Sequence, residues 1–328
     1  MLALFILPAL LGLALVVNLT DDDDDHDEAQ LPPEPEPPIE NPTNPAPTCQ
    51  VFAPPPAPDT FDTALNVPAP QPTSAGITLE DDRTPVRLSG TGGDDIINAT
   101  DEATSIRGNA GNDLLFGGDN DENISGEDGR DTIVAGGGDD TFSGGRGNDL
   151  IYLGDGDDRS AGFDGQDRGN DTVYGGAGDD VLRDDAGSNL TFGGIGNDTI
   201  SSVNTFTGAE LNGADTLIGG AGDDFLSGDA GDLMYGGIGE DQFNVWDNGA
   251  AATIIADFNV NDDVLMIVVP STGSAEPLEF THNAAQNGVA VTIGDDIVAF
   301  LHGVTANQIA TLRTEASVTV FDRLAVSG

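Results

Sequence analysis

The sequence predicts an all-β solenoid, and three observations lead to that prediction. Between Gly90 and about Val245 the chain repeats with a nine-residue period, typified by GGAGDDVLR at Gly175–Arg183. A fixed short period is the signature of a solenoid. Glycine at position 4 and aspartate at position 6 recur in twelve units, and position 8 is apolar in nearly all units. Each unit is therefore predicted to form a Gly-Asp turn and a short strand that buries one side chain.

The apolar position 8 defines the predicted core of the repeat region. We count 16 units, and two of them carry insertions, of four residues near Phe163–Gln166 and of eight near Ser202–Ala209. Only Ser160 and Thr191 are polar at this position. The apolar members of the column are Ile97, Ile106, Leu115, Ile124, Ile133, Phe142, Ile151, Val173, Leu182, Ile200, Leu217, Leu226, Met234 and Phe243.

The turns of the repeat carry the residues that indicate function. Glycine at positions 1, 2 and 4 permits positive φ and close approach of the backbone, so successive carbonyl oxygens can point inward. Position 6 places a carboxylate on the same face as position 8, because strand side chains alternate. Carbonyls and carboxylates together form an all-oxygen site, which favours calcium over magnesium. The candidate ligands are Asp95, Asp113, Asp131, Asp140, Asp149, Asp158, Asp171, Asp180, Asp198, Asp215, Asp224 and Asp241.

The charge balance supports a cation as the partner. The chain has 58 Asp and Glu against 10 basic residues, all of them Arg, and a formal net charge of -48. Nucleic acids and anionic membranes both require cationic side chains, so neither is an expected partner. A zinc site is poorly supported, because three His and the single Cys49 show no ligand spacing.

The pattern G-G-x-G-x-D-x-(apolar)-x over residues 90–245 resembles the RTX, or haemolysin-type, calcium-binding nonapeptide repeat of secreted bacterial proteins. The resemblance implies a parallel β-roll with two nonapeptides per coil, two parallel sheets and several Ca2+ ions between coils. It also implies that turn carbonyls and position-6 carboxylates one coil apart hold each ion. The implied pairs are Asp95/Asp113, Asp113/Asp131, Asp131/Asp149, Asp140/Asp158, Asp180/Asp198, Asp149/Asp171, Asp158/Asp180, Asp198/Asp224 and Asp224/Asp241.

Some turn residues are expected to contribute less. Thr104, Glu122 and Asn189 occupy position 6 of degenerate units, which weakens those sites, and the second turn of the first coil is expected to bind nothing. Asp179, at position 5, is expected to give only its backbone carbonyl.

The N-terminal quarter of the chain has a different composition. Residues 1–20 are an apolar anchor or signal-like segment, whose apolar run over residues 1–17 lacks a basic n-region and a clear cleavage site. We favour an uncleaved anchor slightly over a removed signal. Residues 21–75, acidic and then Pro-rich, are predicted to form a disordered linker, and residues 76–89 the N-terminal edge of the roll.

Residues 246–328 are predicted to form a C-terminal β-rich cap. Expected strands lie at Thr253–Phe258, Val264–Val269, Val289–Ile293, Ile297–Leu301 and Ser317–Phe321, with a short helix at Thr305–Thr311 that begins at Thr305. By resemblance, this region contains an uncleaved secretion signal and the type I secretion machinery is a partner. An N-terminal apolar segment departs from that route and leaves the pathway open.

The two outer faces of the roll are expected to differ. On the sheet that contains the first unit, nine of twelve outward residues are apolar or aromatic, against two of twelve on the other sheet. A long apolar face is an interaction surface or an aggregation risk. We expect it to be covered by a second copy of the chain, by the cap or by a glycan, through Phe116, Tyr152, Tyr174 and Phe192. The alternative is that these are ordinary strand formers.

The predicted function is that of an exported calcium-binding protein, not an enzyme. We expect its folding to be gated by extracellular calcium, and its role to be structural or adhesive at the surface of a bacterium, with tethering through residues 1–17. A polysaccharide-binding or adhesion module is the second hypothesis. A hydrolase is the third, although the sequence contains neither H-E-x-x-H nor G-x-S-x-G.

Overall fold

The computed structural model describes residues 78–80, 86–99, 103–161, 169–183, 186–203, 213–229, 231–247, 251–270, 277–315 and 317–321. All of them belong to the larger of two units of the chain, residues 48–328. The predicted anchor and linker, residues 1–75, lie outside the described residues.

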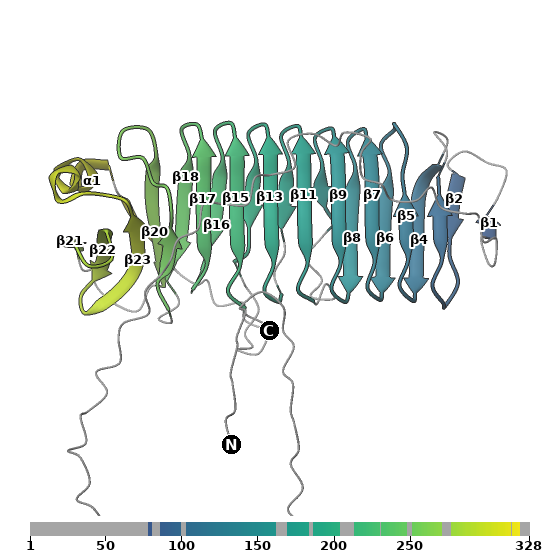
Figure 1. Cartoon of the computed structure of the whole chain (residues 1–328), viewed down its shortest axis with the longest axis horizontal. Helices are drawn as coiled ribbons and strands as arrows, with labels where there is room; N and C mark the ends of the chain where they lie inside the picture. Colours follow the sequence, from purple (N-terminus) through teal and green to yellow (C-terminus); the bar gives the residue numbers. More distant parts are fainter. Residues whose placement is uncertain are drawn as a thin grey trace, which may run out of the picture. The chain divides into compact units, whose positions relative to one another are not determined.

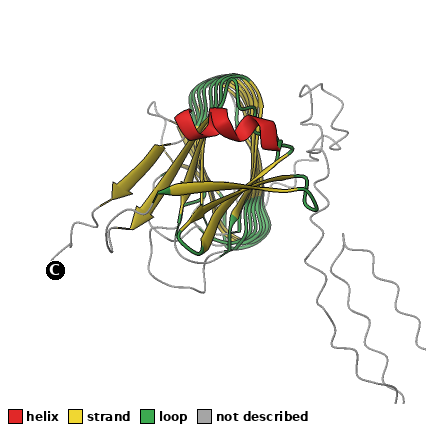
Figure 2. Cartoon of the chain, turned by 90° about the vertical axis from the view of Figure 1, so that its left-hand side faces the viewer, coloured by secondary structure: helices red, strands yellow, loops and turns green. Residues whose placement is uncertain are grey.

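The described chain winds into a parallel β-roll, as the repeat predicts. From β2 to β20, successive strands alternate between two twelve-stranded sheets, so the strands of this stretch that neighbour each other within a sheet are one full coil apart. Figure 1 shows the strands side by side along the roll, and Figure 2 shows the two layers end-on with the turns at both edges. Each of the 16 predicted units contains one strand, from β3 to β18.

We name the sheets A and B. Sheet A contains β1 (Thr78–Glu80), β2 (Val86–Ser89), β4 (Ala103–Ala110), β6 (Asn123–Asp128), β8 (Thr141–Arg146), β10 (Arg159–Ser160), β12 (Val181–Arg183), β14 (Thr199–Ser201), β16 (Phe225–Gly228), β18 (Gln242–Trp246), β20 (Val264–Pro270) and β24 (Ser317–Phe321). Sheet B contains β3 (Ile96–Asn98), β5 (Leu114–Phe116), β7 (Thr132–Gly137), β9 (Leu150–Asp155), β11 (Thr172–Ala177), β13 (Leu190–Ile195), β15 (Thr216–Ala221), β17 (Leu233–Ile238), β19 (Thr253–Ile255), β21 (Leu278–Asn283), β22 (Gly288–Ile293) and β23 (Asp296–His302).

The roll is longer than the repeat alone predicts. The 16 units would form eight coils, whereas the structure has about nine turns. The difference arises because β2 begins the winding before the first unit, and β19 and β20 pair in parallel with β17 and β18 beyond the last unit. The backbone ladder therefore continues after the glycine pattern has ended.

The C-terminal strands close one end of this winding. β23 and β24 extend the two sheets in parallel, whereas β21 and β22 form an antiparallel hairpin. The expected single helix is a 3-10 turn over Ala306–Gln308 followed by α1 over Ile309–Glu315, and Thr305 is the N-cap. Figure 2 shows this helix across the end of the roll. β21 was not predicted from the sequence, and β19 ends at Ile255 rather than at Phe258.

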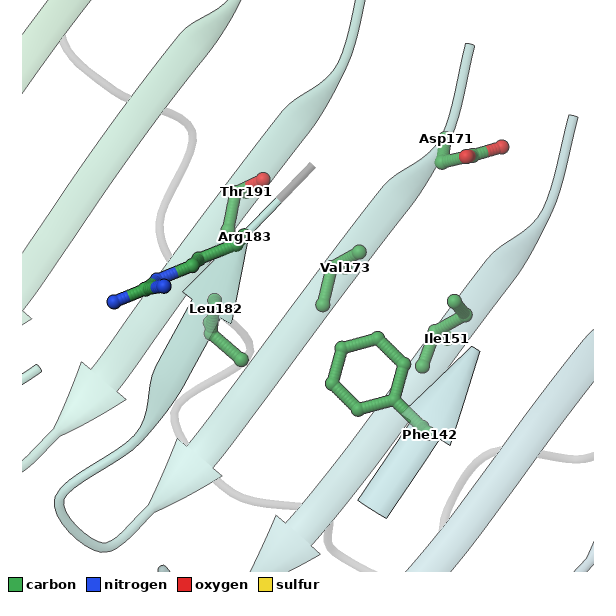
Figure 3. A pocket seen from close by; sticks show the side chains of 7 residues that line it. All are labelled: Phe142, Ile151, Asp171, Val173, Leu182, Arg183 and Thr191. Atoms are coloured by element: carbon green, nitrogen blue, oxygen red, sulfur yellow. The ribbon is translucent and has the colours of Figure 1, made fainter. Parts of the chain in front are cut away.

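The predicted position-8 column forms the core between the sheets, since its apolar members are all buried. It divides into two clusters, one from Leu88 to Leu182 and one from Ile200 to Leu312 that includes cap residues. The buried Thr191 lies in the interval between them. Figure 3 shows a small pocket at this place, lined by Phe142, Ile151, Asp171, Val173, Leu182, Arg183 and Thr191. Ser160 follows Phe142 in sheet A, where it supplies a short polar side chain instead of an apolar one.

The outward face of sheet B has the register expected from the two insertions. Tyr152, Tyr174, Phe192, Ile218 and Tyr235 lie side by side on successive strands. The rings of Tyr152 and Tyr174 stack with centroids 4.9 Å apart, and those of Tyr174 and Phe192 stack at 4.7 Å. These separations match the spacing of neighbouring strands, so the rings lie face to face along the roll.

Candidate metal centre

Glycine has two separate roles in the repeated turn. At positions 2 and 4 the backbone has positive φ, for example 120° at Gly176 and 140° at Gly178, a region that other residues rarely adopt. At position 1 the requirement is space. A methyl group on Gly175 would collide with the Oδ2 atom of Asp180 and with the carbonyl oxygen of Gly193 in the next coil. The turn therefore brings a carboxylate oxygen and a backbone carbonyl oxygen close to one point.

Position-6 side chains form two continuous ladders along the roll, one at each edge. We call row A the residues that precede the strands of sheet A, and row B those that precede the strands of sheet B. In both rows the Oδ1 atom accepts a hydrogen bond from the backbone N–H of the position-6 residue one coil earlier. Row A is Glu122, Asp140, Asp158, Asp180, Asp198, Asp224, Asp241 and Asp263. Row B is Asp95, Asp113, Asp131, Asp149, Asp171, Asn189, Asp215 and Asp232.

These ladders bring together every pair of carboxylates that the sequence analysis names. The N–H to Oδ1 distances within those nine pairs run from 2.7 Å to 3.0 Å. All twelve candidate aspartates are buried. The insertions do not disturb the ladders, because pairs 22 and 26 residues apart keep the same contact as pairs 18 apart.

The second carboxylate oxygens are the chemically unusual atoms of the site. Buried Oδ2 atoms without a hydrogen-bond partner occur at Asp113, Asp131, Asp140, Asp158, Asp180, Asp198 and Asp224. An unpaired buried polar atom is costly, and a buried anion more so. A Cβ atom added to any of five turn glycines would lie beside both such an oxygen and a carbonyl oxygen of the next coil. These glycines are Gly108, Gly126, Gly175, Gly193 and Gly219. Two negatively polarised oxygens with no donor between them are suited to a cation.

Burial raises the pKa of these carboxyl groups because desolvation disfavours their charged form. The pKa of Asp180 and of Asp224 is raised to about 8, and that of Asp131 to about 7. The backbone N–H that bonds each Oδ1 atom opposes this shift, whereas neighbouring carboxylates in the same row add to it. Without a cation, the rows therefore hold protons at a pH where exposed aspartates do not.

The donor set fits calcium better than a transition metal. Among the residues that the structure describes, no group of three or more His, Cys, Asp or Glu side chains gathers as a compact metal site. An ion in the rows would instead be held by carboxylates from successive coils and by turn carbonyls. Hard oxygen donors in a flexible loop are typical calcium ligands.

Several functional residues were missed in the sequence. Asp232 and Asp263 continue rows B and A beyond the predicted ligands. Asp232 could have been found, because it lies two residues before the core residue Met234 in the shortened unit. The Oδ1 and Oδ2 atoms of Asp257 accept the N–H groups of Gly236 and Gly237, which holds the last turn of the repeat.

A second, outer ladder was also missed. The expectation that Asp179 gives only its backbone carbonyl is incomplete, because its Oδ1 atom accepts the N–H of Asn197 at 2.7 Å. Its own N–H donates to Asp157, one coil earlier. Position 5 thus forms an exposed ladder of opposite direction beside the buried one. At Asp95, by contrast, the second oxygen accepts hydrogen bonds from Thr91.

The fold and the site together define a β-solenoid whose two edges carry rows of buried carboxylate oxygens. A family model for the RTX calcium-binding nonapeptide repeat matches residues 89–121, 100–133, 125–160, 134–168, 165–200 and 211–243. Residues 89–243 of this chain therefore contain the RTX calcium-binding nonapeptide repeat. No curated protein matches the chain.

In the part of the chain that the structure describes, no helix has the length and apolar character needed to cross a bilayer. The apolar run over residues 1–17 lies outside that part of the chain, so its role as an anchor or signal stays a prediction.

We predict that the calcium-free roll becomes more stable as the pH falls from 8 to 5. The folded-state pKa values of Asp131, Asp180 and Asp224, about 7, 8 and 8, exceed the ordinary value of 3.8. The folded chain therefore holds more protons in this window, and its stability decreases as the pH rises. Far-UV circular dichroism in chelator across this range tests the sign, because acid should shift the largely disordered chain toward the strand-rich roll.

Saturating calcium is the control for this measurement. The ions take the place of the protons, so the acid stabilisation should disappear when calcium is present. Stability in chelator that increases with pH between 5 and 8 would contradict the assignment of the buried rows.

Proposed function

We propose that this protein is an exported calcium-binding β-roll whose folding is gated by extracellular calcium and whose role is structural, at or beyond the cell surface. The observation that carries the proposal is the series of buried, unpartnered Oδ2 atoms, which at Asp113, Asp131, Asp180, Asp198 and Asp224 lie near a carbonyl oxygen of the next coil. The RTX repeat of residues 89–243 supports calcium as the cation.

The gate follows from the electrostatics of the two rows. Closing the roll without a cation buries a carboxylate in each coil, next to the carboxylates of the coils before and after it. Both desolvation and mutual repulsion oppose this closure. A cation supplied to each pair reverses the balance, so the free energy of binding becomes free energy of folding.

Export gives this gate a physiological setting. Extracellular calcium modules bind at roughly 10⁻⁴–10⁻³ M, a concentration far above that of the cytosol. A chain with a formal net charge of -48 would stay open where calcium is scarce and close outside. Passage through the type I secretion machinery, and tethering through residues 1–17, are the finer parts of this proposal and rest on family resemblance and on the apolar run.

The aromatic face gives less support to the glycan-binding alternative. A sugar ring packs against the open face of an aromatic ring, whereas Tyr174 has Tyr152 stacked on one side and Phe192 on the other. The interplanar angles are 8° and 5°, so the rings turn their faces to one another. A structural role therefore agrees better with the geometry than a polysaccharide platform does.

We predict that far-UV circular dichroism of the full chain changes from a largely disordered spectrum in chelator to a strand-rich spectrum in calcium. The midpoint should lie in the range of roughly 10⁻⁴–10⁻³ M. Magnesium at equal concentration is the control, because its stricter octahedral geometry suits these turns poorly. Equal strand content in chelator and in calcium would contradict calcium-gated folding.

We predict that Asp180→Asn raises the calcium midpoint of folding by about tenfold or more, equivalent to about 1.4 kcal/mol. The amide keeps the Oδ1 acceptor for the N–H of Asp158 but replaces the unpartnered Oδ2 atom with a donor.

The matched control is Asp179→Asn, which removes one charge from the adjacent, exposed residue and keeps its acceptor for Asn197. Its midpoint should change by less than about twofold, since exposed charges are screened by solvent. Calcium titrations of both variants, followed by circular dichroism, compare the two calcium midpoints. Equal shifts for the two would show that general charge, not the buried ligand, sets the response.

A further inference from the structure

A buried hydrogen-bond network surrounds Asp232, at the C-terminal end of row B. The Asp232 side chain has no exposed surface. Its Oδ1 atom accepts the N–H of Asp215 at 2.9 Å, as elsewhere in the row. Its Oδ2 atom accepts the Ser202 hydroxyl at 2.8 Å and the Asp229 N–H at 2.7 Å. Unlike the seven aspartates with an unpartnered Oδ2 atom, this carboxylate has protein donors for both oxygens.

Asp224, the row A residue in the neighbouring unit, is the natural comparison. It is equally buried, and its Oδ2 atom has no hydrogen-bond partner. A methyl group on Gly219 would collide with that oxygen and come within 2.6 Å of the Gly236 carbonyl oxygen. At the corresponding Gly228, a methyl group would lie 2.9 Å from Asp232 Oδ2 and 3.2 Å from the Met234 sulfur, with no carbonyl among its nearest atoms. The pair of oxygens that suits a cation is therefore present at Asp224 and absent at Asp232.

The same network joins the last coils of the roll to the C-terminal strands. The Thr253 hydroxyl, on β19, donates to the carbonyl of Asp229 at 2.6 Å. The backbone N–H of Ile254 donates to the carbonyl of Asp232 at 2.8 Å. Ser202 follows β14, so the contacts connect β14, β17 and β19 through buried, mostly uncharged donors. Such bonds to a carboxylate are charge-assisted and stabilise it without a metal.

Row B also lacks a carboxylate shortly before this network begins. Two coils before Asp232, Asn189 occupies the position of the aspartate, and its N–H donates to Asp215 at 2.6 Å. The core column changes in the same unit, where Thr191 separates the two hydrophobic clusters. Two independent features of the repeat, the carboxylate and the apolar residue, thus fail together in one unit.

We propose that Asp232 is a calcium-independent latch: the cation sites of row B end before β15, and hydrogen bonds from Ser202 and Asp229 hold the final coils to the cap in their place. This inference rests on the proposed function, because it concerns where the calcium sites stop. Row A continues its unpartnered oxygens through Asp224, so the two edges of the roll bind calcium over different lengths.

The test is the dependence of stability on calcium concentration, measured by thermal or urea unfolding of the full chain. The slope of unfolding free energy against the logarithm of free calcium counts the ions released on unfolding. Ser202→Ala should lower stability by the same amount at every calcium concentration and leave this slope unchanged. Asp224→Asn should reduce the slope by about one ion.

Two further variants serve as a control and as a substitute for Ser202→Ala. Ser201→Ala changes the adjacent outward residue of β14 and should alter neither stability nor slope. If Ser202→Ala fails to fold, Thr253→Val removes the hydroxyl at the other end of the network with little change of volume, and the same unchanged slope is expected.

The outcomes separate this proposal from the proposed function. A slope reduced by Ser202→Ala as much as by Asp224→Asn would overturn the latch, and so would a stability equal to that of Ser201→Ala. A wild-type slope of zero would overturn calcium binding itself, whereas the stability loss of Ser202→Ala relative to Ser201→Ala would still decide whether the latch exists.

Discussion

The structure depends on one repeated arrangement, in which a buried carboxylate oxygen and a backbone carbonyl oxygen of the next coil lie near the same point beside a turn glycine. Neither oxygen can donate a hydrogen bond, and both are removed from water. Such a pair destabilises the roll unless a cation lies between or beside the two atoms. In the proposed function, closure of the roll and binding of the cation are therefore coupled in one equilibrium.

The other features of the repeat serve to hold that contact in place. The N–H of one coil fixes the Oδ1 atom of the next, so the direction of the Oδ2 atom is determined. Gly175 leaves room for Asp180 Oδ2 and the Gly193 carbonyl, and Gly178 gives the turn its positive φ. Because the ladder needs only position 6 in register, insertions before that position leave it intact. This explains why residues 26 apart, Asp198 and Asp224, keep the contact.

Much of this arrangement could be predicted from spacing alone. A period of nine with apolar position 8 fixes which residues are buried, so the core from Ile97 to Phe243 and the paired aspartates followed directly. The outer ladder could not be foreseen, because an exposed Asp179 has the same sequence signature whether or not its side chain bonds Asn197. The hydrogen bonding of both Asp232 oxygens could not be foreseen either, because the partner Ser202 lies 30 residues earlier across an insertion. The β21 strand was missed because Leu278–Asn283 contains mostly polar residues and lacks the apolar and β-branched runs by which the other cap strands were predicted.

The two edges of the roll are consequently unequal, although the sequence repeats along both. Row A keeps its unpartnered oxygens from Asp140 to Asp224 before it ends in the hydrogen-bonded Asp263, whereas row B passes through Asn189 before it ends in the hydrogen-bonded Asp232. The neutral Asn189 and the hydrogen-bonded Asp232 therefore limit the part of row B in which the proposed function requires a cation. The C-terminal strands then continue both sheets without the glycine pattern, and their buried apolar side chains share one core cluster with the last repeat units and with Leu312 of α1.

The most direct test of the central claim is anomalous X-ray diffraction from crystals of the full chain grown in millimolar calcium. The account predicts anomalous density beside the Oδ2 atoms of Asp158, Asp180 and Asp198, at a spacing of one coil along row A. Ordered carboxylates at these three positions with no anomalous density beside them would contradict it.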